Sequence, residues 1–307
     1  MASPSTEKPV LRALTGCTGV GKTEWALHLA QANNAEIISC DSLLFYRGMD
    51  IGTAKPTRSE LALVPHHLID CCDVSERMDV ARFVALARDA LEQITARGRV
   101  PLIVGGSGFY LRAFFAPVVD DVAVSLDLRM SVAQLTKEQA LGRLRELNAQ
   151  GLGSLDAANP RRVVRALERC LASGKTLDVL AKDFAEQVSP FADWDLELTQ
   201  LDREPDDLNQ RIEMRVAAMM SAALVDEVRR LLAVGLSDNP SAARAIGYRE
   251  VIDVLQGRLD ATKLTTEIER NTRRLVKKQR TWFRTQLPAH RVLNAGSVKA
   301  VSELFRS

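Results

Sequence analysis

Residues 16–23 read Gly16-Cys17-Thr18-Gly19-Val20-Gly21-Lys22-Thr23 and match the phosphate-loop pattern G-x-x-x-x-G-K-[ST] at every fixed position. An apolar run at 10–14 precedes them and predicts a strand, and 24–30 follow with apolar side chains at helical spacing. In such a loop the glycines turn backbone N–H groups inward, Lys22 supplies an ammonium group, and the Thr23 hydroxyl suits Mg²⁺. We therefore expect a phosphate group here, and the loop alone leaves open whether it belongs to a nucleotide or to another pyrophosphate ester.

Length and composition indicate an ordinary globular protein. The chain has 307 residues, 46% hydrophobic and 26% charged, which is enough for one large domain or two modest ones. The net charge of +2 indicates no particular partner. Residues 1–9 lack the apolar core of a signal peptide and no apolar run approaches the length of a membrane span, so we expect a cytoplasmic protein without a membrane partner. The five cysteines lack metal-ligand spacing, which favours reduced thiols.

A second strand is predicted at 36–40 and is followed directly by Asp41. Ligands of open α/β sheets bind beyond the carboxyl ends of the strands, so we expect Asp41 to face the same crevice as the phosphate loop. A carboxylate there suits a general base or a hydrogen-bond acceptor, and the alternative is an Asp that only caps a turn. The aperiodic segment 43–56 has the length of functional loops. His66 and His67 are interpreted as structural residues.

The third strand is predicted at 100–104, after an amphipathic helix at 78–97, and it runs into Gly105-Gly106-Ser107. Enzymes that hydrolyse ATP or GTP usually place an acid at the end of this strand. Only Asp70, after a very short apolar run, could substitute for it. The sequence therefore argues against a motor or switch hydrolase and predicts backbone and hydroxyl donors at the crevice.

The alternation of strands and helices predicts an α/β fold with a P-loop NTPase-like parallel sheet flanked by helices. Strand patterns disappear in 118–190, where helices are expected at 128–150 and 161–171, so this segment is predicted to be a helical insertion domain. It divides the core into a first part, 1–117, and a second part, 191–307. The second part is expected to begin with a strand at 194–201 and to continue as helices at 206–233, 242–255 and 262–286.

Two groups of basic residues could bind a long anion. Arg161, Arg162 and Arg165 are interpreted equally well as a solvated helix face or as phosphate ligands. The last predicted helix crowds seven basic residues beside Trp282 and Phe283: Arg270, Arg273, Arg274, Lys277, Lys278, Arg280 and Arg284. A basic helix with aromatic residues is typical of nucleic-acid backbone binding, and a solvated charged face is the alternative.

Together these motifs resemble the tRNA dimethylallyltransferases, and the resemblance spans nearly the whole chain. Besides the phosphate loop it rests on Cys40-Asp41-Ser42 with Tyr46, on Gly48-Met49-Asp50-Ile51-Gly52-Thr53-Ala54-Lys55-Pro56, and on the segments 65–70, 104–107, 161–168, 245–250 and 279–283. Members of that family transfer a dimethylallyl group from its diphosphate to the N6 amine of adenosine 37, beside the anticodon. The resemblance implies this activity, on tRNAs that read codons beginning with U, with release of pyrophosphate.

The resemblance also implies site residues. The loop 16–23, with Mg²⁺ on Thr23, would hold dimethylallyl diphosphate, and the catalytic residues would be Asp41 as proton acceptor, Lys22, and Ser107 as a phosphate donor where the family usually has Thr. Contacts with the anticodon stem-loop of tRNA would come from Asp41, Ser42, Leu43, Leu44, Ser107, Arg129, Arg161, Arg162, Val163, Val164, Arg165, Arg244, Ala245, Ile246, Gly247, Tyr248 and Arg249. We expect the chain to act as a monomer.

The chain departs from the family pattern at a few positions. Cys17 replaces a common proline, Phe109 replaces an aliphatic residue, and the stretch 151–160 is short and lacks the usual Asp before the arginines. Three other functions remain open at this point: an isopentenyltransferase acting on free adenine nucleotides, a P-loop small-molecule kinase, and an RNA-binding protein without catalysis. The missing acid after the third strand argues against the kinase.

Overall fold

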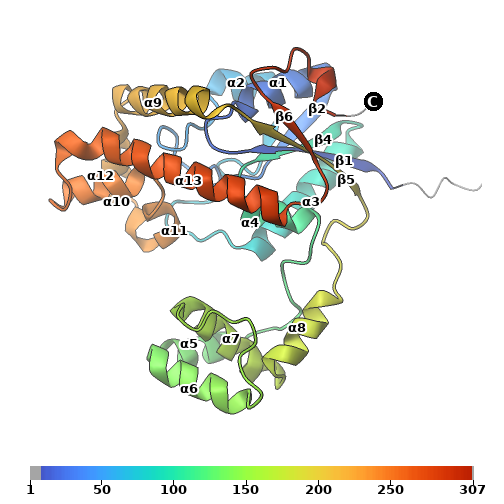
Figure 1. Cartoon of the computed structure of the whole chain (residues 1–307), viewed down its shortest axis with the longest axis vertical. Helices are drawn as coiled ribbons and strands as arrows, with labels where there is room; N and C mark the ends of the chain where they lie inside the picture. Colours follow the sequence, from blue (N-terminus) through green and yellow to red (C-terminus); the bar gives the residue numbers. More distant parts are fainter. Residues whose placement is uncertain (1–7, 306–307) are drawn as a thin grey trace, which may run out of the picture. The chain divides into compact units, whose positions relative to one another are not determined.

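A six-stranded sheet contains the predicted strands, and every pair of neighbouring strands in it is parallel. The structure is a computed structural model and describes residues 8–305. The spatial order of the strands is β3-β2-β4-β1-β5-β6 (Figure 1). Their bounds are Val10–Gly16 (β1), Ala35–Ser39 (β2), His66–His67 (β3), Val100–Gly105 (β4), Asp195–Asp202 (β5) and Arg291–Asn294 (β6). The predicted α/β class is confirmed.

Helices cover both faces of this sheet. Helix α1 (Lys22–Ala32) connects β1 to β2, and α3 (Val80–Ala96) leads into β4. The chain moves toward the β3 edge through α1 and back toward β1 through α3, so right-handed crossovers place the two helices on opposite faces. Shorter elements complete this half of the chain: α2 (Arg58–Leu63), α4 (Gly108–Leu111) and the 3₁₀ turn η1 (Arg112–Phe114).

The phosphate loop follows β1, which lies between β4 and β5 where the direction of the crossovers reverses. Crevices at such switch points are the usual ligand sites of open α/β sheets. Gly16 ends β1 with φ of 152°, and a Cβ at this position would lie 2.4 Å from the carbonyl oxygen of Leu201 on β5. Only glycine permits this approach, so the motif glycine also sets how closely the loop packs on the sheet.

The chain after β5 contains more breaks than the sequence predicts. The helix expected at 206–233 is divided into α9 (Pro205–Ser221) and α10 (Leu224–Ala233), with Ala223 at φ of 66° between them. The helix expected at 242–255 is divided into α11 (Pro240–Ala243) and α12 (Tyr248–Leu255), with Gly247 at φ of 94°. Both expectations of a continuous helix are wrong, because a residue with positive φ interrupts each one.

The last predicted helix is present as α13 (Leu264–Gln286), which is preceded by the 3₁₀ turn η3 (Ala261–Lys263). The expectation that only helices follow β5 is wrong, since β6 adds a short edge strand beside β5. The 3₁₀ turns η2 (Leu236–Asp238) and η4 (Val301–Glu303) complete this part. Between residues 8 and 305, no helix is both long and apolar enough to cross a membrane.

Residues 116–189 form a second compact unit, and the described residues 8–115 and 190–305 form the first. The second unit contains α5 (Leu126–Ala133), α6 (Lys137–Leu147), α7 (Pro160–Ser173) and α8 (Leu177–Ala185) around a core that includes Leu144, Val163 and Leu167. The continuous helix expected at 128–150 is wrong. Thr136 and Gln139 form a capping box that starts a new helix, and this Thr-x-x-Gln pattern was the signal in the sequence.

Candidate functional site

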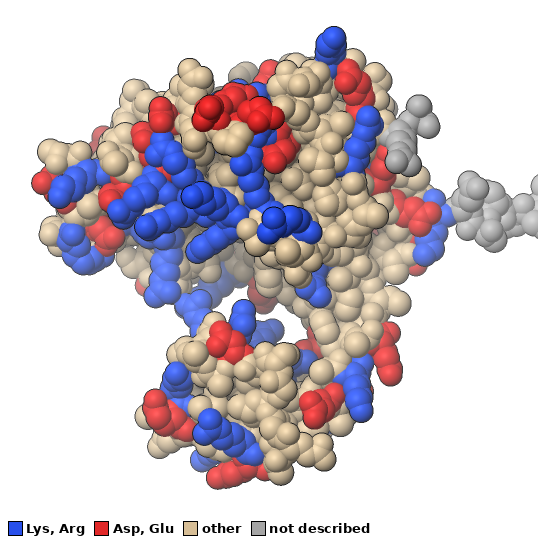
Figure 2. Space-filling model, viewed as in Figure 1, with Lys and Arg blue, Asp and Glu red and all other residues tan. Residues whose placement is uncertain are grey.

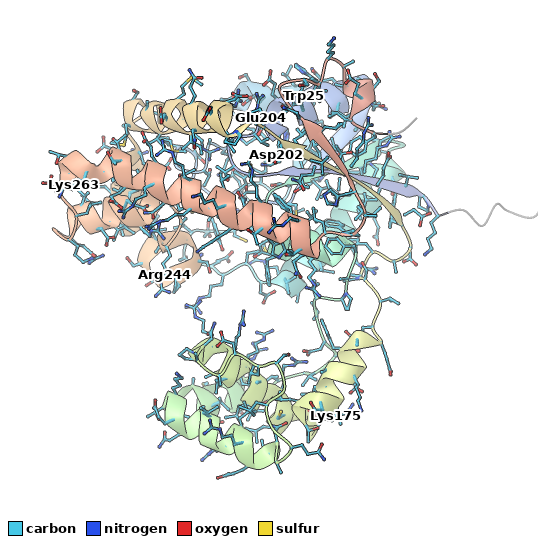
Figure 3. The ribbon with its side chains drawn as sticks, viewed as in Figure 1. Trp25, Lys175, Asp202, Glu204, Arg244 and Lys263 are labelled. Carbon is cyan, nitrogen blue, oxygen red and sulfur yellow. The ribbon has the colours of Figure 1, made fainter. Side chains whose placement is uncertain are left out.

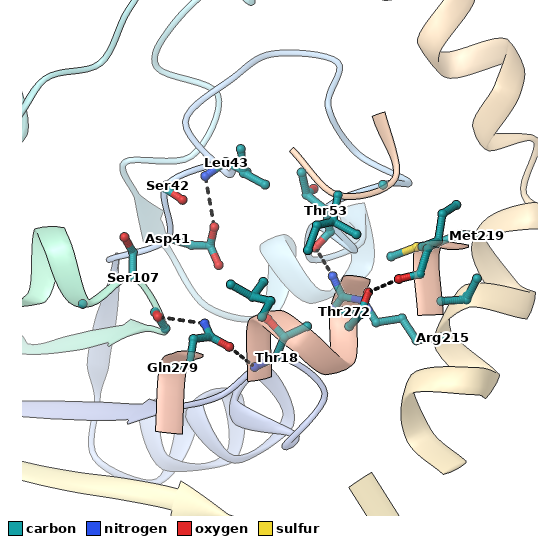
Figure 4. A pocket seen from close by; sticks show the side chains of 17 residues that line it. Thr18, Asp41, Ser42, Leu43, Thr53, Ser107, Arg215, Met219, Thr272 and Gln279 are labelled. Atoms are coloured by element: carbon teal, nitrogen blue, oxygen red, sulfur yellow. Dashed lines mark hydrogen bonds between the residues drawn. The ribbon is translucent and has the colours of Figure 1, made fainter. Parts of the chain in front are cut away.

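A cavity of about 260 Å³ opens beyond the carboxyl ends of β1, β2 and β4 (Figure 4). The loops after these strands contribute Thr18, Asp41 and Ser107, and α9 and α13 supply the opposite wall. Its apolar residues are Val216, Met219, Ile268 and Leu275 of the two helices, joined by Ile246 from the segment before α12, and its polar residues are Arg215, Thr272 and Gln279. The three chain segments that the sequence singled out as the crevice therefore meet at one cavity.

The geometry of Asp41 is compatible with both of the interpretations that the sequence left open. One carboxylate oxygen accepts the backbone N–H of Leu43 at 3.0 Å, which is a turn cap. The side chain also lines the cavity, and Figure 4 shows its second oxygen directed into that space. Because the cap holds one oxygen in place, the other has a defined direction toward a ligand, as a general base requires.

The ammonium group of Lys22 turns back onto its own loop. Its Nζ donates to the carbonyl oxygens of Gly16 at 2.8 Å and Cys17 at 2.9 Å. The residue as a whole is half-buried, but the ammonium end is enclosed, and this burial lowers its pKa from 10.5 to about 8 despite the opposing effect of Asp41. A phosphate oxygen is a stronger hydrogen-bond acceptor than these carbonyls. A bound phosphate would therefore offset the free-energy cost of burying the charge of Lys22.

Three arginines on or just before α9 face the phosphate loop and were not among the predicted site residues. Arg203 Nε donates to the carbonyl of Val20, and Arg211 Nε donates to that of Gly19, both at 2.8 Å. Arg215 lines the cavity; burial lowers the pKa of its guanidinium and Asp41 raises it. Arg211 and Arg215 are four residues apart within α9, which places them on one helix face, and this was the signal that the sequence offered.

A second cavity, of about 500 Å³, lies on the other side of Asp41 and Arg215, which line both cavities. Its wall includes the anion-binding side chains of Lys22, Arg211 and Arg215 together with the acids Glu24, Asp41 and Glu60. The first cavity supplies apolar surface, and the second supplies the lysine of the phosphate loop and the arginines of α9, which can bind a phosphate group. The two cavities together suit a molecule with a diphosphate at one end and a short apolar group at the other.

The residues fit a magnesium ion that is held mainly by a ligand's own oxygens. Within the described residues, no three His, Cys, Asp or Glu side chains cluster as a metal site. The hydroxyl-bearing Thr23 and the carboxylate of Asp41 line the second cavity. Mg²⁺ commonly takes one or two protein oxygens and completes its shell with water and phosphate oxygens, so this sparse donor set is of the right kind.

Gln279 of α13 connects the phosphate loop to the loop after β4. Its Oε1 accepts the backbone N–H of Thr18 at 3.0 Å, and its Nε2 donates to the carbonyl of Gly106 at 2.9 Å (Figure 4). The neighbouring Ser107 precedes α4, but its hydroxyl caps none of the helix N–H groups. This hydroxyl lines the cavity and can donate to a ligand.

Asp70 could have taken the place of the acid that ATP- or GTP-hydrolysing enzymes carry, but it is bound within the framework of the fold. Asp70 accepts a hydrogen bond from the ammonium of Lys55 at 2.5 Å and lines neither cavity. His67 contacts the buried carboxylate of Glu36 at 2.6 Å, and neither it nor His66 lines the two cavities. The structure therefore places these three residues in the framework of the fold.

Helix α13 carries the predicted concentration of basic residues, and Figure 2 shows Lys and Arg side chains gathered along it. Some of this charge is already paired within the protein: Arg280 with Asp202 at 2.7 Å, Arg273 with Glu213 at 2.6 Å, and Arg270 with Glu267. Lys277 and Lys278 are exposed and form no ion pair with any described residue. Arg274 and Arg284 are also exposed and form no ion pair with a described residue, so the charge that remains for a partner extends from the middle of the helix to its last turn.

A groove of about 370 Å³ beside this part of α13 is lined by Phe109, Arg112, Lys278 and Trp282. Phe109 is 61% exposed, although large aromatic side chains are usually covered. Aromatic faces beside cations are suited to stack unpaired bases and to neutralise the adjoining phosphates.

The other predicted RNA contacts differ in exposure. Arg244 is exposed, Arg249 is half-buried and paired with Glu250, Val164 is half-buried on the core of the second unit, and Ala245 and Gly247 are buried. Ser42, Leu43 and Ile246 line the first cavity and Leu44 lines the second, while Arg129, Arg161, Arg162 and Arg165 are exposed on the second unit. The side chains of Val163 and Tyr248 are fully buried, Val163 in the core of the second unit and Tyr248 against Glu227. The prediction of side-chain contact with RNA is corrected for these two, because packing within the protein already uses them.

Comparison with known proteins connects this geometry to a family. The sequence pattern of the IPP transferase family matches residues 44–286 of the chain. The tRNA dimethylallyltransferase of Opitutus terrae is 68% identical over 305 residues, which cover 99% of both chains. The tRNA dimethylallyltransferase of an Exiguobacterium species is 41% identical over 285 residues, which cover 91% of this chain and 89% of the relative.

Solved structures lead to the same family. The full-length tRNA isopentenylpyrophosphate transferase from Bacillus halodurans superposes with a TM-score of 0.70 at 35% identity, covering 97% of this chain and 93% of the other. A eukaryotic dimethylallyltransferase captured acting on tRNA superposes with a TM-score of 0.81 at 25% identity, covering 94% of this chain and 74% of the other.

Proposed function

The chain belongs to the IPP transferase family, and on this premise we propose that it transfers a dimethylallyl group from dimethylallyl diphosphate to tRNA. The proposed acceptor is N6 of adenosine 37 in tRNAs that read codons beginning with U, and the second product is pyrophosphate. Transfer to tRNA is supported by the curated relatives, which are tRNA dimethylallyltransferases. The position of the acceptor rests on the motif resemblance.

One observation carries the proposal: the cavity that holds Lys22 and Arg211 and the cavity with the apolar wall meet at Asp41 and Arg215. The diphosphate fits among the groups of the phosphate loop and α9. The dimethylallyl group then extends past Arg215 toward the apolar wall. The scissile carbon lies near Asp41 in this arrangement, which is where a proton acceptor for an incoming amine is needed.

The reaction is a displacement at the first carbon of the dimethylallyl group. The N6 amine attacks this carbon, the carbon–oxygen bond breaks, and its electron pair leaves with pyrophosphate while the N6 proton passes to Asp41. Lys22 and Arg215 stabilise the negative charge that grows on the leaving group, and the Ser107 hydroxyl donates to a phosphate oxygen. A magnesium ion on Thr23 would supply further charge neutralisation when bound.

The target base has to leave its stack to reach this cavity, which unpaired anticodon-loop RNA permits at low cost. We propose that Lys277 and Lys278 bind the RNA backbone and that the groove at Phe109 and Trp282 holds a neighbouring base. The exposed arginines of the second unit are proposed to bind further phosphates. The proposal also includes action as a monomer in the cytoplasm.

Incubation with Mg²⁺, labelled dimethylallyl diphosphate and unmodified tRNA with adenosines at 36–38 tests this function. We expect label in the RNA and an equal amount of released pyrophosphate. A tRNA with guanosine at position 37 is the matched control and should remain unlabelled, because guanine lacks the N6 amine.

Two outcomes would contradict the proposal. Labelling of AMP, ADP or ATP without labelling of tRNA would show an isopentenyltransferase of free nucleotides. Transfer of a phosphoryl group from ATP to a small molecule, without prenyl transfer, would show a kinase.

A further inference from the structure

Glu227 of α10 is a buried carboxylate that lines neither cavity nor the α13 groove, and the function described above does not use it. It is 2% exposed. Its carboxylate accepts four hydrogen bonds: from the backbone N–H groups of Asp50 at 3.1 Å, Ile51 at 2.7 Å and Gly52 at 3.1 Å, and from the Tyr248 hydroxyl at 2.6 Å. It forms no ion pair with any residue from 8 to 305, so these dipoles alone compensate its burial.

The three N–H groups belong to a tight turn at residues 49–55, here called the strap. Within it the Thr53 hydroxyl donates to the carbonyl of Met49 at 2.7 Å, and the N–H of Ala54 donates to the carbonyl of Ile51 at 3.0 Å. Three successive N–H groups pointing one way form a positive end that resembles a helix N-terminus, and a carboxylate is the matching partner. Glu227 therefore holds the strap through its backbone.

The strap also has almost no room to move against α12. A Cβ on Gly52 would lie 2.5 Å from Cε2 of Tyr248, the residue whose hydroxyl completes the Glu227 bonding. The glycine permits this close packing. The position of the strap is thus defined by a carboxylate on one side and an aromatic ring on the other.

The strap ends at the site. The carbonyl of Thr53 accepts a hydrogen bond from Arg215 Nη2 at 2.8 Å, the one hydrogen bond that this guanidinium makes within the described residues (Figure 4). Figure 4 shows the guanidinium beside Thr53 in the cavity wall. A guanidinium on a long side chain needs such an anchor to present its planar fork to an anion.

We propose that Glu227 is a positioning residue that acts through the strap to aim Arg215 at the diphosphate. This inference rests on the diphosphate site of the proposed function. Glu227 lines neither cavity, and its effect on Arg215 passes through the hydrogen bond between Thr53 and Arg215.

Binding of inorganic pyrophosphate with Mg²⁺, measured by equilibrium dialysis, tests this without any requirement for tRNA or turnover. Glu227→Gln keeps the shape but replaces one acceptor oxygen with an NH₂ donor facing the strap. We expect affinity for pyrophosphate to fall about tenfold in the otherwise unaltered protein. In the Arg215→Ala background, the same substitution should change affinity less than twofold, because the group it positions is absent.

Glu36→Gln is the matched control, since Glu36 is equally buried, at 2% exposed, but binds Arg97 and His67 away from the strap. It should leave pyrophosphate affinity unchanged. If Glu227→Gln does not fold, Tyr248→Phe takes its place. This substitution removes one of the four hydrogen bonds to Glu227 and is measured in the same two backgrounds, with Arg215 intact and with Arg215→Ala.

The proposal is overturned if the Glu227 substitution leaves the affinity for pyrophosphate unchanged. A loss of affinity by the same factor with Arg215 intact and with Arg215→Ala would also overturn it, since that result indicates a general structural role. It is also overturned if the unaltered protein binds no pyrophosphate. That last result removes the diphosphate site itself and is therefore distinguishable from failure of the positioning role alone.

Discussion

The enclosed ammonium of Lys22 predicts that binding of dimethylallyl diphosphate weakens as the pH rises through about 8. Burial lowers the pKa of this group from 10.5 to about 8. The ligand-free protein is therefore charged at Lys22 in about 90% of molecules at pH 7 and in about 10% at pH 9. A bound diphosphate favours the charged form, so the complex keeps the proton across this range. The dissociation constant is expected to rise about tenfold between pH 7 and pH 9.

Titration calorimetry with Mg²⁺ at pH 7, 8 and 9 measures this effect directly. A phosphate ester loses its last proton near pH ~6, so the charge of the ligand changes little over the range. Repeating each titration in buffers with different heats of ionisation counts the protons taken up. Uptake should increase from about 0.1 proton per binding event at pH 7 to about 0.9 at pH 9.

Lys22→Met is the control, because it keeps a similar length and cannot carry charge. Its affinity should be weaker at pH 7 and independent of pH. A dissociation constant that stays flat from pH 7 to 9, or a fall in affinity that persists in Lys22→Met, would refute the assignment.

The free energy of unfolding of the ligand-free protein should depend on pH in the opposite direction to the affinity for the diphosphate. The unfolded chain binds more protons at this position between pH 8 and 10.5, so the free energy of unfolding should rise with pH across that window.

Three further predictions concern substitutions. Asp41→Asn should lower kcat by a factor of about 10²–10⁴ in the tRNA prenylation assay while tRNA affinity stays nearly constant, since an amide cannot take the N6 proton; a parallel loss of affinity would contradict this. Gly52→Ala should lower the free energy of unfolding in urea by about 1–3 kcal/mol, because the new Cβ would lie 2.5 Å from a packed ring, whereas Gly142→Ala, with nothing within 4 Å, should not destabilise. Lys277→Ala combined with Lys278→Ala should reduce the salt dependence of tRNA binding by a log–log slope of about 2, and an unchanged slope would exclude this stretch from the RNA surface.

Local patterns predicted the parts of the site that depend on neighbouring residues in the chain. The phosphate loop, Asp41 and Ser107 each follow a strand, and the parallel topology brings the ends of those strands to one edge of the sheet. Knowing the order of strands and helices was therefore enough to place these residues together.

Other parts could not be read from local patterns. The continuous helices expected at 206–233 and 242–255 are divided at Ala223 and Gly247, where backbone φ is positive. Helical periodicity continues across both residues. Ala223 is a good helix former and gives no sign of the change in direction, whereas Gly247 is a residue that helix interiors disfavour. The division matters because it creates α10, which carries Glu227.

The sequence by itself determined the chemistry that this protein can perform, because the phosphate loop, the acid after the second strand and the basic last helix are each coded by residues close together in the chain. The tertiary structure decided which distant groups serve that chemistry. Arg215 and Gln279 reach the site, while Tyr248 and much of the charge on α13 are used inside the protein. The physical reason is that hydrogen bonds and ion pairs between residues far apart in the chain depend on how helices pack, and spacing along the chain does not encode that packing.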